Sequence, residues 1–268
     1  MLVLAHISDL HLDGTRRATE RAERVRDRLW ELPGRVDALL VTGDVADHGT
    51  ESEYEEAARV LGLHDPDTPF PVLTCPGNHD SRGPWRKALL GEPEAVEPKT
   101  AGPAPGGPAD PEPVNSVHVF DDTGAAVLMC DSSVPGSDEG ELDERTYAWI
   151  EETLDGLDGS VRALLAFHHP PVALHHPLPD AYRLRAPDAL AALLERRSEI
   201  AGVITGHAHT PASPTFAGRP LVVGPGVTWT LRLPWEGEGA ADRDAPPGFA
   251  FHVLDDEGRL TSHFRVAG

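Results

Sequence analysis

The sequence predicts an α/β fold in a single domain, and three observations carry this prediction. In the first half of the chain, apolar runs of strand length alternate with segments whose apolar residues recur at helical spacing. The second half ends in a series of short strand-like runs. With 268 residues, 40 % of them hydrophobic, the chain can bury a substantial core. No internal repeat of fixed period and no second domain can be recognised, so residues 1–268 are predicted to form one domain.

The first half begins with an apolar run at residues 2–5, which is expected to be a strand. A helix follows, because four apolar residues recur on one face among arginines and glutamates: Ala18, Ala22, Val25 and Leu29. Residues 37–41 form the next expected strand. Thr50-Glu51-Ser52-Glu53 has the pattern of a capping box, which starts a helix with Tyr54, Ala58 and Leu61 facing inward. A strand at residues 71–75 and a short helix near residues 85–90 complete this half.

The second half begins with a stretch rich in Pro, Gly and acidic residues at 91–114, which is predicted to be a flexible surface loop. Residues 114–120 and 125–130 then form an expected hairpin, whose outer edge could pair two copies of the chain. The remaining expected elements are a helix at 143–154, a strand at 162–167, a helix at 187–197, and strands at 215–216, 220–223, 228–233, 249–254 and 260–266. A second flexible loop is expected at residues 235–247.

The charge of the chain narrows its possible partners. Lys and Arg number 23 against 44 Asp and Glu, which gives a formal net charge of −21. A nucleic acid polymer or an anionic membrane requires a basic surface, so neither is expected as a partner. A small phosphorylated substrate stays possible, because bound cations reverse the sign of the local charge.

The cysteines and the apolar runs indicate the cellular setting. Cys75 and Cys130 lie in apolar runs and are expected to be buried core thiols, with no disulfide framework. The first strand begins at residue 2, which leaves no room for a signal peptide, and no apolar run approaches the ~20 residues that span a bilayer. A cytoplasmic location is therefore expected.

Five short motifs, each placed directly after an apolar run, carry the chemistry of the chain. They are Asp9-Leu10-His11, Gly43-Asp44-Val45-Ala46-Asp47, Gly77-Asn78-His79-Asp80, His168-His169-Pro170-Pro171 and Gly206-His207-Ala208-His209. Each motif alone has an ordinary explanation, such as a surface histidine or an Asn-Gly turn. Five of them at strand ends are expected to converge on one edge of a sheet. Their carboxylate, amide and imidazole groups would there hold two cations side by side.

In this order, the five motifs resemble those of the calcineurin-like metallophosphoesterase superfamily: D-x-H, G-D-x-x-D, G-N-H-[DE], H-x-P and G-H-x-H. The resemblance runs from Asp9 to His209. It implies a four-layer α/β/β/α sandwich of two mixed sheets flanked by helices. Residues 40–49 and 130–136, the latter followed by Gly140-Glu141-Leu142, also look like the class III cyclic-nucleotide phosphodiesterases, and this match is less specific.

The resemblance implies a ligand set for two metal ions. Asp9, His11 and His209 would hold one metal, Asn78, His168 and His207 would hold the other, and Asp44 would bridge both. Mixed oxygen and imidazole ligands suit divalent or mixed-valence Mn, Fe, Zn or Co. A water shared by two such ions loses a proton near neutral pH and can attack phosphorus in line.

The resemblance also suggests roles beyond metal binding. His79 would protonate or stabilise the leaving alkoxide, with Asp80 orienting it from behind, and Asp47 would support a ligand or cap a turn. His169 is expected to pack beside the site rather than to bind metal. His175 and His176 would either line its rim or be solvated. Arg183 and Arg185 could reach the substrate, although ion pairs at the flank of a helix are the simpler expectation.

These observations predict a metal-dependent phosphoric ester hydrolase acting on a small phosphodiester, with a 3′,5′- or 2′,3′-cyclic nucleotide as the preferred substrate. A phosphodiesterase for glycerol- or lipid-derived diesters would share every metal ligand. The acidic charge disfavours a nuclease, and Asp80 stands where protein phosphatases carry Glu. A non-catalytic, metal-free scaffold is the alternative from a different class of protein, although no ligand is missing.

Overall fold

The computed structural model describes residues 1–92 and 112–268 and contains two main sheets. The first sheet is built from β1 (Leu2–Ile7), β2 (Ala38–Thr42), β3 (Val72–Cys75), β12 (Gly248–Leu254) and β13 (Leu260–Val266). Its strand order is β13-β12-β1-β2-β3, in which β1, β2 and β3 run parallel and β12 and β13 are antiparallel to their neighbours.

The second sheet has six strands: β4 (Ser116–Phe120), β5 (Ala125–Met129), β6 (Arg162–Ala166), β7 (Ile200–Thr205), β8 (Thr215–Phe216) and β9 (Arg219–Val223). In the order β4-β5-β6-β7-β9-β8, its four central strands are parallel, and the edge strands β4 and β8 are antiparallel. A separate short ribbon pairs β10 (Thr230–Leu231) with β11 (Ala241–Asp242).

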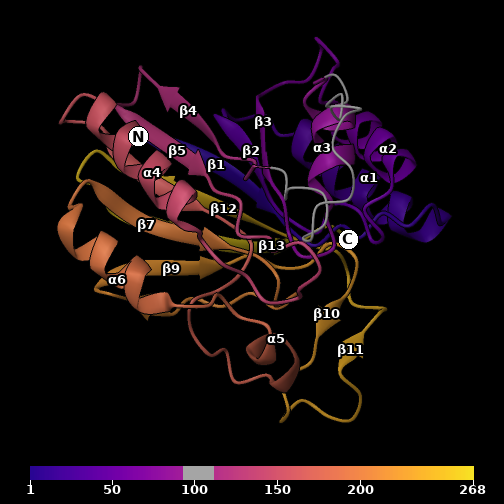
Figure 1. Ribbon diagram of the computed structural model, residues 1–268. Helices are drawn as coiled ribbons and strands as arrows, with labels where there is room; N and C mark the ends of the chain where they lie inside the picture. Colours follow the sequence, from indigo (N-terminus) through magenta and orange to yellow (C-terminus); the bar gives the residue numbers. More distant parts are fainter. Residues whose placement is uncertain (93–111) are drawn as a thin grey trace, which may run out of the picture.

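Helices cover the outer face of each sheet (Figure 1). Those on the first sheet are α1 (Arg16–Trp30), α2 (Glu51–Leu61) and α3 (Arg82–Leu89). On the second sheet they are α4 (Glu144–Gly156) and α6 (Pro187–Arg196), while the short helix α5 (Pro177–Ala181) lies beside the β10–β11 ribbon. The expected four-layer α/β/β/α arrangement of two mixed sheets is confirmed.

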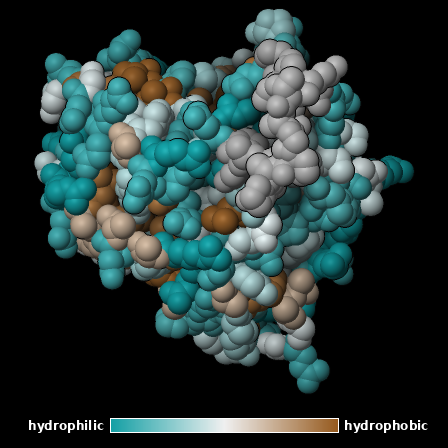
Figure 2. Space-filling view, viewed as in Figure 1, coloured by the Kyte–Doolittle hydropathy of each residue, from teal (hydrophilic) through white to brown (hydrophobic). Residues whose placement is uncertain are grey.

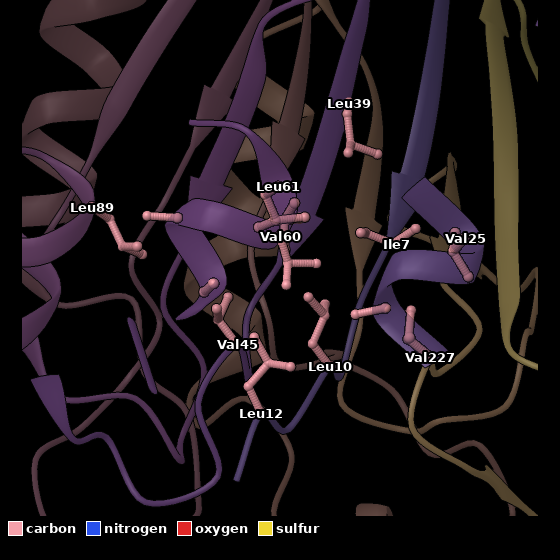
Figure 3. Close-up of a cluster of buried hydrophobic side chains, with 14 of the residues drawn as sticks. Ile7, Leu10, Leu12, Val25, Leu39, Val45, Val60, Leu61, Leu89 and Val227 are labelled. Carbon is pink, nitrogen blue, oxygen red and sulfur yellow. The ribbon is translucent and has the colours of Figure 1, made fainter. Parts of the chain in front are cut away.

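Alternation along the strands explains the layers, because successive side chains of a strand point to opposite faces. Leu2 and Leu4 of β1 join the apolar layer between the two sheets, which also contains Val127 and Ile204. Ile7 faces the helices instead, where it packs in one cluster with Val25 and Leu61 (Figure 3). Cys75 and Cys130 are buried free thiols, as expected.

Several boundaries differ from the sequence-based expectations. The capping box at Thr50 and Glu53 is present and starts α2 as predicted. Helix α5 was not predicted, since its segment is rich in proline, but a proline in the first helical turn is compatible with a helix. The loop expected at residues 235–247 contains β11, and the loop expected at 91–114 falls largely outside the described residues.

Among the described residues, no helix is long and apolar enough to cross a membrane.

A buried ion pair connects the two halves of the sandwich. Nε of Arg82, in α3, donates to Oδ2 of Asp131 at 2.8 Å, and both side chains are buried. Asp131 follows β5 in the other sheet and also accepts from the main-chain N–H groups of Val114 and Ser133. Most of the surface around this framework is hydrophilic on the face shown in Figure 2, in keeping with the acidic composition.

Asp131→Ala is expected to lower the free energy of unfolding by about 2–4 kcal/mol, because the buried N–H groups of Val114 and Ser133 lose their acceptor and the Arg82 guanidinium loses one hydrogen bond. Equilibrium unfolding in urea measures this difference. Asp121→Ala, on the exposed turn of the β4–β5 hairpin, is the control and should change stability little. A loss below about 1 kcal/mol for Asp131→Ala would contradict the structural role of the pair.

Candidate metal centre

The seven predicted ligands lie at the ends of five parallel strands. Asp9 and His11 follow β1, Asp44 follows β2 and Asn78 follows β3, all in the first sheet. His168 follows β6, and His207 and His209 follow β7, in the second sheet. The expectation that all five motifs meet on one edge of one sheet is therefore wrong. The centre lies where the ends of two sheets meet, and each sheet supplies part of it.

The backbone of the ligand loops is unusual and well connected. The main-chain N–H of Asp9 donates to the carbonyl of Gly43, and that of His11 donates to the carbonyl of Asp44. Five of the seven ligands have a positive φ between 43° and 69°: Asp9, His11, Asp44, His207 and His209. Such left-handed conformations are uncommon for residues with a side chain, cost of order 1–3 kcal/mol each, and cluster at functional sites.

Glycine is required at one contact between these loops. A Cβ on Gly77 would lie 2.2 Å from Oδ1 of Asp44 and 2.5 Å from the main-chain nitrogen of the same residue. Neither neighbour can yield, since one is the side chain of a candidate ligand and the other is backbone. Gly77 therefore allows the loop after β3 to bring Asn78 against Asp44.

The first group of ligands is compact. Nε2 of His11 lies 3.2 Å from Nε2 of His209, and Nε2 of His209 lies 3.5 Å from Oδ1 of Asp9. One ligand atom from each of these three residues falls within 4.8 Å of the other two. All three side chains are buried. The three atoms can therefore bind a single cation.

The second group is arranged in the same way. Nδ1 of His207 lies 3.2 Å from Nε2 of His168 and 3.1 Å from Oδ1 of Asn78. Asp44 lies between the groups, because its Oδ2 is 3.5 Å from Nε2 of His11 and 3.3 Å from Nε2 of His168. The structure thus brings all seven predicted ligands together, in the two groups that the family resemblance implied.

The electrostatics of the centre suit a cation. Burial raises the pKa of Asp9, and neither of its carboxylate oxygens has a hydrogen-bond partner among the described residues. The neighbouring Ser8 hydroxyl donates instead to the carbonyl of Thr42. Burial also raises the pKa of Asp44, but the charges of His168 and His11 outweigh it and hold that pKa well below its ordinary value. Burial lowers the pKa of His207 to about 3, so this imidazole is neutral, as a metal ligand must be.

Three of the four candidate imidazole ligands are oriented by a partner on their other ring nitrogen. Nδ1 of His11 contacts Oδ1 of Asp47 at 2.8 Å, and Nδ1 of His168 contacts the carbonyl of Thr42 at 2.6 Å. Nδ1 of His209 contacts the carbonyl of Trp229 at 3.3 Å. Such partners fix the tautomer and the direction of a metal-binding histidine. Asp47 therefore supports a ligand, the first of the two roles expected for it.

Trp229 was not anticipated from the sequence. Besides its carbonyl, it provides an indole ring that stacks on His209 with centroids 4.8 Å apart and planes 8° apart. The same ring stacks on His11 at 4.9 Å. An aromatic residue 20 positions beyond the last motif carries no recognisable signal in a single sequence.

His79 lies at the edge of the centre with its ring half-exposed. Its main-chain N–H donates to Oδ1 of Asp44, and its Nδ1 contacts the carbonyl of Asp47 at 2.8 Å. The ring makes an edge contact with His11, with centroids 4.6 Å apart. These contacts leave Nε2 as the ring nitrogen that can meet a substrate.

The role expected for Asp80 is revised by its contacts. Its oxygens accept from the main-chain N–H groups of Val45, Ala46 and Gly77 and from the hydroxyl of Tyr54. Burial, followed by the charge of Asp44, raises its pKa to about 6. Asp80 therefore ties the loops after β2 and β3 together, and the described contacts that orient the His79 ring come from Asp47.

The other candidate residues lie around the centre. His175 is exposed, while His176 is buried and accepts from the main-chain N–H of Leu178 at the start of α5. Arg185 pairs with Glu139, which fits the expected ion pair, whereas Arg183 donates to the main-chain carbonyl of Asp180. His169 is fully buried next to His168 and His207.

An apolar cavity of about 80 Å³ adjoins Ala208, between the last two ligands, and is lined by Leu174, His176, Pro179, Leu231 and Leu233 among others.

Metal is expected to stabilise the folded chain, because the buried carboxylate of Asp9 accepts no hydrogen bond from the described residues. Added to metal-free protein at about 100 times its Kd, Mn²⁺ should raise the free energy of unfolding by about 2.7 kcal/mol per site. That corresponds to roughly 5–10 °C in Tm for a chain of this size. Asp9→Asn should melt higher than the unchanged chain without metal and gain less from Mn²⁺. Differential scanning calorimetry of chelator-treated samples measures both effects, and equal gains in the two proteins would contradict this prediction.

Two sheets flanked by helices, with clustered His, Asp and Asn side chains where their strands end, define a metallophosphoesterase. The chain belongs to the calcineurin-like phosphoesterase family, whose sequence model matches residues 2–211. Members of this family use divalent metals, and the donor set described above fits such ions.

Curated relatives agree with this assignment. The chain is 33 % identical over 262 residues to a protein of Rhodococcus erythropolis named as a probable cyclic nucleotide phosphodiesterase, a match covering 94 % of this chain and 80 % of the relative. It is 31 % identical over 264 residues to a cAMP/cGMP dual specificity phosphodiesterase of Mycobacterium tuberculosis, covering 95 % and 76 % of the two chains. It is also 31 % identical over 215 residues to the glycerophosphodiester phosphodiesterase GpdQ of Enterobacter lignolyticus, covering 78 % and 71 %.

Solved structures confirm the fold. A dimetal phosphatase from Danio rerio superposes with a TM-score of 0.63 at 14 % identity, covering all of this chain and 96 % of the other. With its family and its phosphodiesterase relatives, the chain is a phosphoric ester hydrolase.

Proposed function

We propose that the chain is a dinuclear metal-dependent phosphodiesterase whose preferred substrate is a cyclic nucleotide. The position of Asp44 is the observation that supports two metal ions in the centre. One of its carboxylate oxygens lies within 3.5 Å of an imidazole nitrogen from each ligand group, so a single side chain can serve both metals. When bound, two divalent transition metal ions such as Mn, Fe, Zn or Co supply a deprotonated water and neutralise charge on the phosphoryl oxygens.

The residues of the chain provide the rest of the reaction. Asp9, His11 and His209 would hold one metal, and Asn78, His168 and His207 would hold the other. Main-chain hydrogen bonds from Asp9 to Gly43 and from His11 to Asp44 fix two of the loops that carry these ligands, and such fixed positions favour a well-oriented reaction. His79, at the open side of the centre, donates a proton from Nε2 to the departing alkoxide. Asp80 holds the loop that carries His79 and does not itself contact the substrate.

Two observations support a cyclic nucleotide over a glycerol-derived diester. Relatives named as cyclic nucleotide phosphodiesterases match over 94–95 % of this chain. In addition, the cavity beside Ala208 is apolar, which suits the face of a nucleobase better than a glycerol group. Because another relative is named as a glycerophosphodiester phosphodiesterase, glycerophosphodiesters are the alternative substrate class.

A panel of diesters assayed with Mn²⁺-loaded protein tests the substrate. It contains 3′,5′-cAMP, 2′,3′-cAMP, glycerophosphoethanolamine and bis(p-nitrophenyl) phosphate, with an apurinic cyclic ribose phosphate as the matched control. A cyclic nucleotide should have a kcat/KM at least about tenfold above that of the glycerol diester, the effect of ~1.4 kcal/mol. A higher kcat/KM for glycerophosphoethanolamine would instead support the alternative.

Leu233→Ser is expected to raise KM for the preferred cyclic nucleotide by about 3–10-fold, because it removes an apolar wall worth roughly 1 kcal/mol. Leu233 is half-buried at the rim of the cavity. The same change should leave KM for glycerophosphoethanolamine unaltered, since that substrate has no ring to place there. Steady-state kinetics with the two substrates measure the difference, and equal changes in KM would contradict use of the cavity.

A further inference from the structure

One candidate metal ligand lacks the support that the other three imidazoles have. Nδ1 of His207 faces Asn78 and His168, which makes it the ligating nitrogen. Its Nε2 is buried and has no hydrogen-bond partner among the described residues. A metal-binding histidine usually donates its other ring N–H to an acceptor. His207 therefore needs an acceptor beside its Nε2.

The ring of His169 lies beside that of His207 and contains a nitrogen, Nε2, that could serve as this acceptor. Its Nε2 is also buried without a hydrogen-bond partner among the described residues, and its side chain is fully buried. The rings of His169 and His207 lie with centroids 4.9 Å apart and planes 46° apart. Two buried polar atoms without partners in neighbouring rings are rarely left that way in a native structure.

The contact between Ser132 and His169 is compatible with the tautomer of His169 whose Nε2 can accept a proton. The hydroxyl oxygen of Ser132 lies 2.8 Å from Nδ1 of His169 and also accepts from the main-chain N–H of the same residue at 3.3 Å. When Nδ1–H donates to this oxygen as well, Nε2 is left as an acceptor. The main-chain carbonyl of Asp138 is another acceptor near the ring.

Gly140 holds the ring in place from the other side. A Cβ at Gly140 would lie 2.2 Å from Cγ and 2.3 Å from Nδ1 of His169. The backbone of Gly140 is in turn fixed, because its N–H donates to the carbonyl of Arg183 and its carbonyl accepts from the N–H of Arg185. Ser132 belongs to the stretch 130–136 that resembles class III phosphodiesterases, Gly140 begins the segment that follows this stretch, and both lie against His169.

We propose that His169 is a positioning residue of the metal centre, whose neutral ring accepts the Nε2–H of His207 while Nδ1 of His207 binds the second metal. A small ring rotation or one buried water completes the bond. In this arrangement Ser132 accepts from Nδ1–H of His169, and Gly140 sets the position of the ring. This inference rests on the proposed dinuclear function, and it gives the residues around 132 and 140 a role in building the second metal site.

Metal titration tests the inference without relying on turnover. Four variants are compared with the unchanged chain: His169→Phe, His169→Gln, Ser132→Ala, and His118→Phe as the control. Phe keeps a planar ring without nitrogen, whereas Gln places an amide oxygen near the position of Nε2. His118 lies in β4, outside the centre. Two-site Mn²⁺ binding is followed by isothermal calorimetry and by the electron paramagnetic resonance signal of free Mn²⁺, and circular dichroism verifies folding.

His169→Phe is expected to weaken one of the two Mn²⁺ sites by about 10–100-fold and leave the other unchanged. His169→Gln should recover most of this loss, Ser132→Ala should show a smaller loss in the same direction, and His118→Phe should bind as the unchanged chain does. In an Asn78→Ala background, where the second site is already disabled, His169→Phe should not weaken the remaining site.

Other outcomes would overturn the inference. Two unaltered sites in folded His169→Phe would mean that the ring bonds to Asp138 and does not support His207. Complete loss of the second site that Gln cannot recover would make His169 a ligand itself. Failure of the unchanged chain to bind Mn²⁺ would remove both this inference and the proposed function. Two Mn²⁺ sites with the expected loss in His169→Phe, but without diester hydrolysis, would remove the proposed function alone.

Discussion

Asp44→Asn is expected to lower kcat/KM for any diester by about 10³-fold or more, because metal ions contribute several kcal/mol to the transition state and each 1.36 kcal/mol is a factor of ten. The amide keeps one oxygen for the main-chain N–H of His79. It places either an NH₂ group or a weaker neutral ligand between Nε2 of His11 and Nε2 of His168. Both ligand groups therefore lose their shared anion.

The measurement combines kinetics with metal analysis of the same samples. Asp44→Asn should bind at most one metal tightly, whereas Asp121→Asn, on the exposed hairpin turn, should bind two and keep full activity. Two tightly bound metals with undiminished turnover in Asp44→Asn would show that the two groups do not depend on a common carboxylate.

His79→Ala is expected to slow hydrolysis in a manner that depends on the leaving group. For a substrate that releases an alkoxide, a positioned acid contributes typically 10²–10⁴-fold, so kcat should fall by about that factor. For bis(p-nitrophenyl) phosphate the loss should be small, because p-nitrophenolate departs without protonation. The contacts of His79 with Asp44 and Asp47 involve its main chain and Nδ1, which leaves Nε2 for this task.

The control for this prediction is a neighbouring histidine outside the centre. His48 is exposed and its Nδ1 contacts Glu53, so His48→Ala should retain activity on both substrates. Metal content should stay at the value of the unchanged chain in both variants. Equal losses of activity on the two substrates in His79→Ala would indicate damage to the metal site rather than loss of an acid.

The seven candidate ligands came from the family resemblance of motifs that follow apolar strands, and the structure brings their side chains close together. Asp9 after β1 and His207 after β7 can be recognised locally, since strand and motif are neighbours in the chain. The family resemblance then supplied the two-sheet sandwich, which alternation of strands and helices alone would not have selected. The meeting of two sheet ends at one centre depends on packing between the sheets, and the sequence contains no local signal for it.

The supporting residues were harder to predict for the same reason. The carbonyl of Thr42 orients His168 across 126 positions of chain, and that of Trp229 orients His209 from a loop beyond the last motif. A carbonyl is present in every residue, so composition cannot mark which one is used. The role of Asp80 in orienting His79 came from the family resemblance, whereas in the structure Asp80 accepts from the amides of Val45 and Ala46 in the neighbouring loop.

The left-handed backbone at five ligands has an evolutionary consequence. A lineage relieved of selection for hydrolysis would gain thermostability by exchanging these residues for glycine or asparagine, which tolerate that geometry at less energetic expense. In a descendant that no longer hydrolyses its substrate, the first substitutions in this centre should therefore occur at the five residues with positive φ: Asp9, His11, Asp44, His207 and His209.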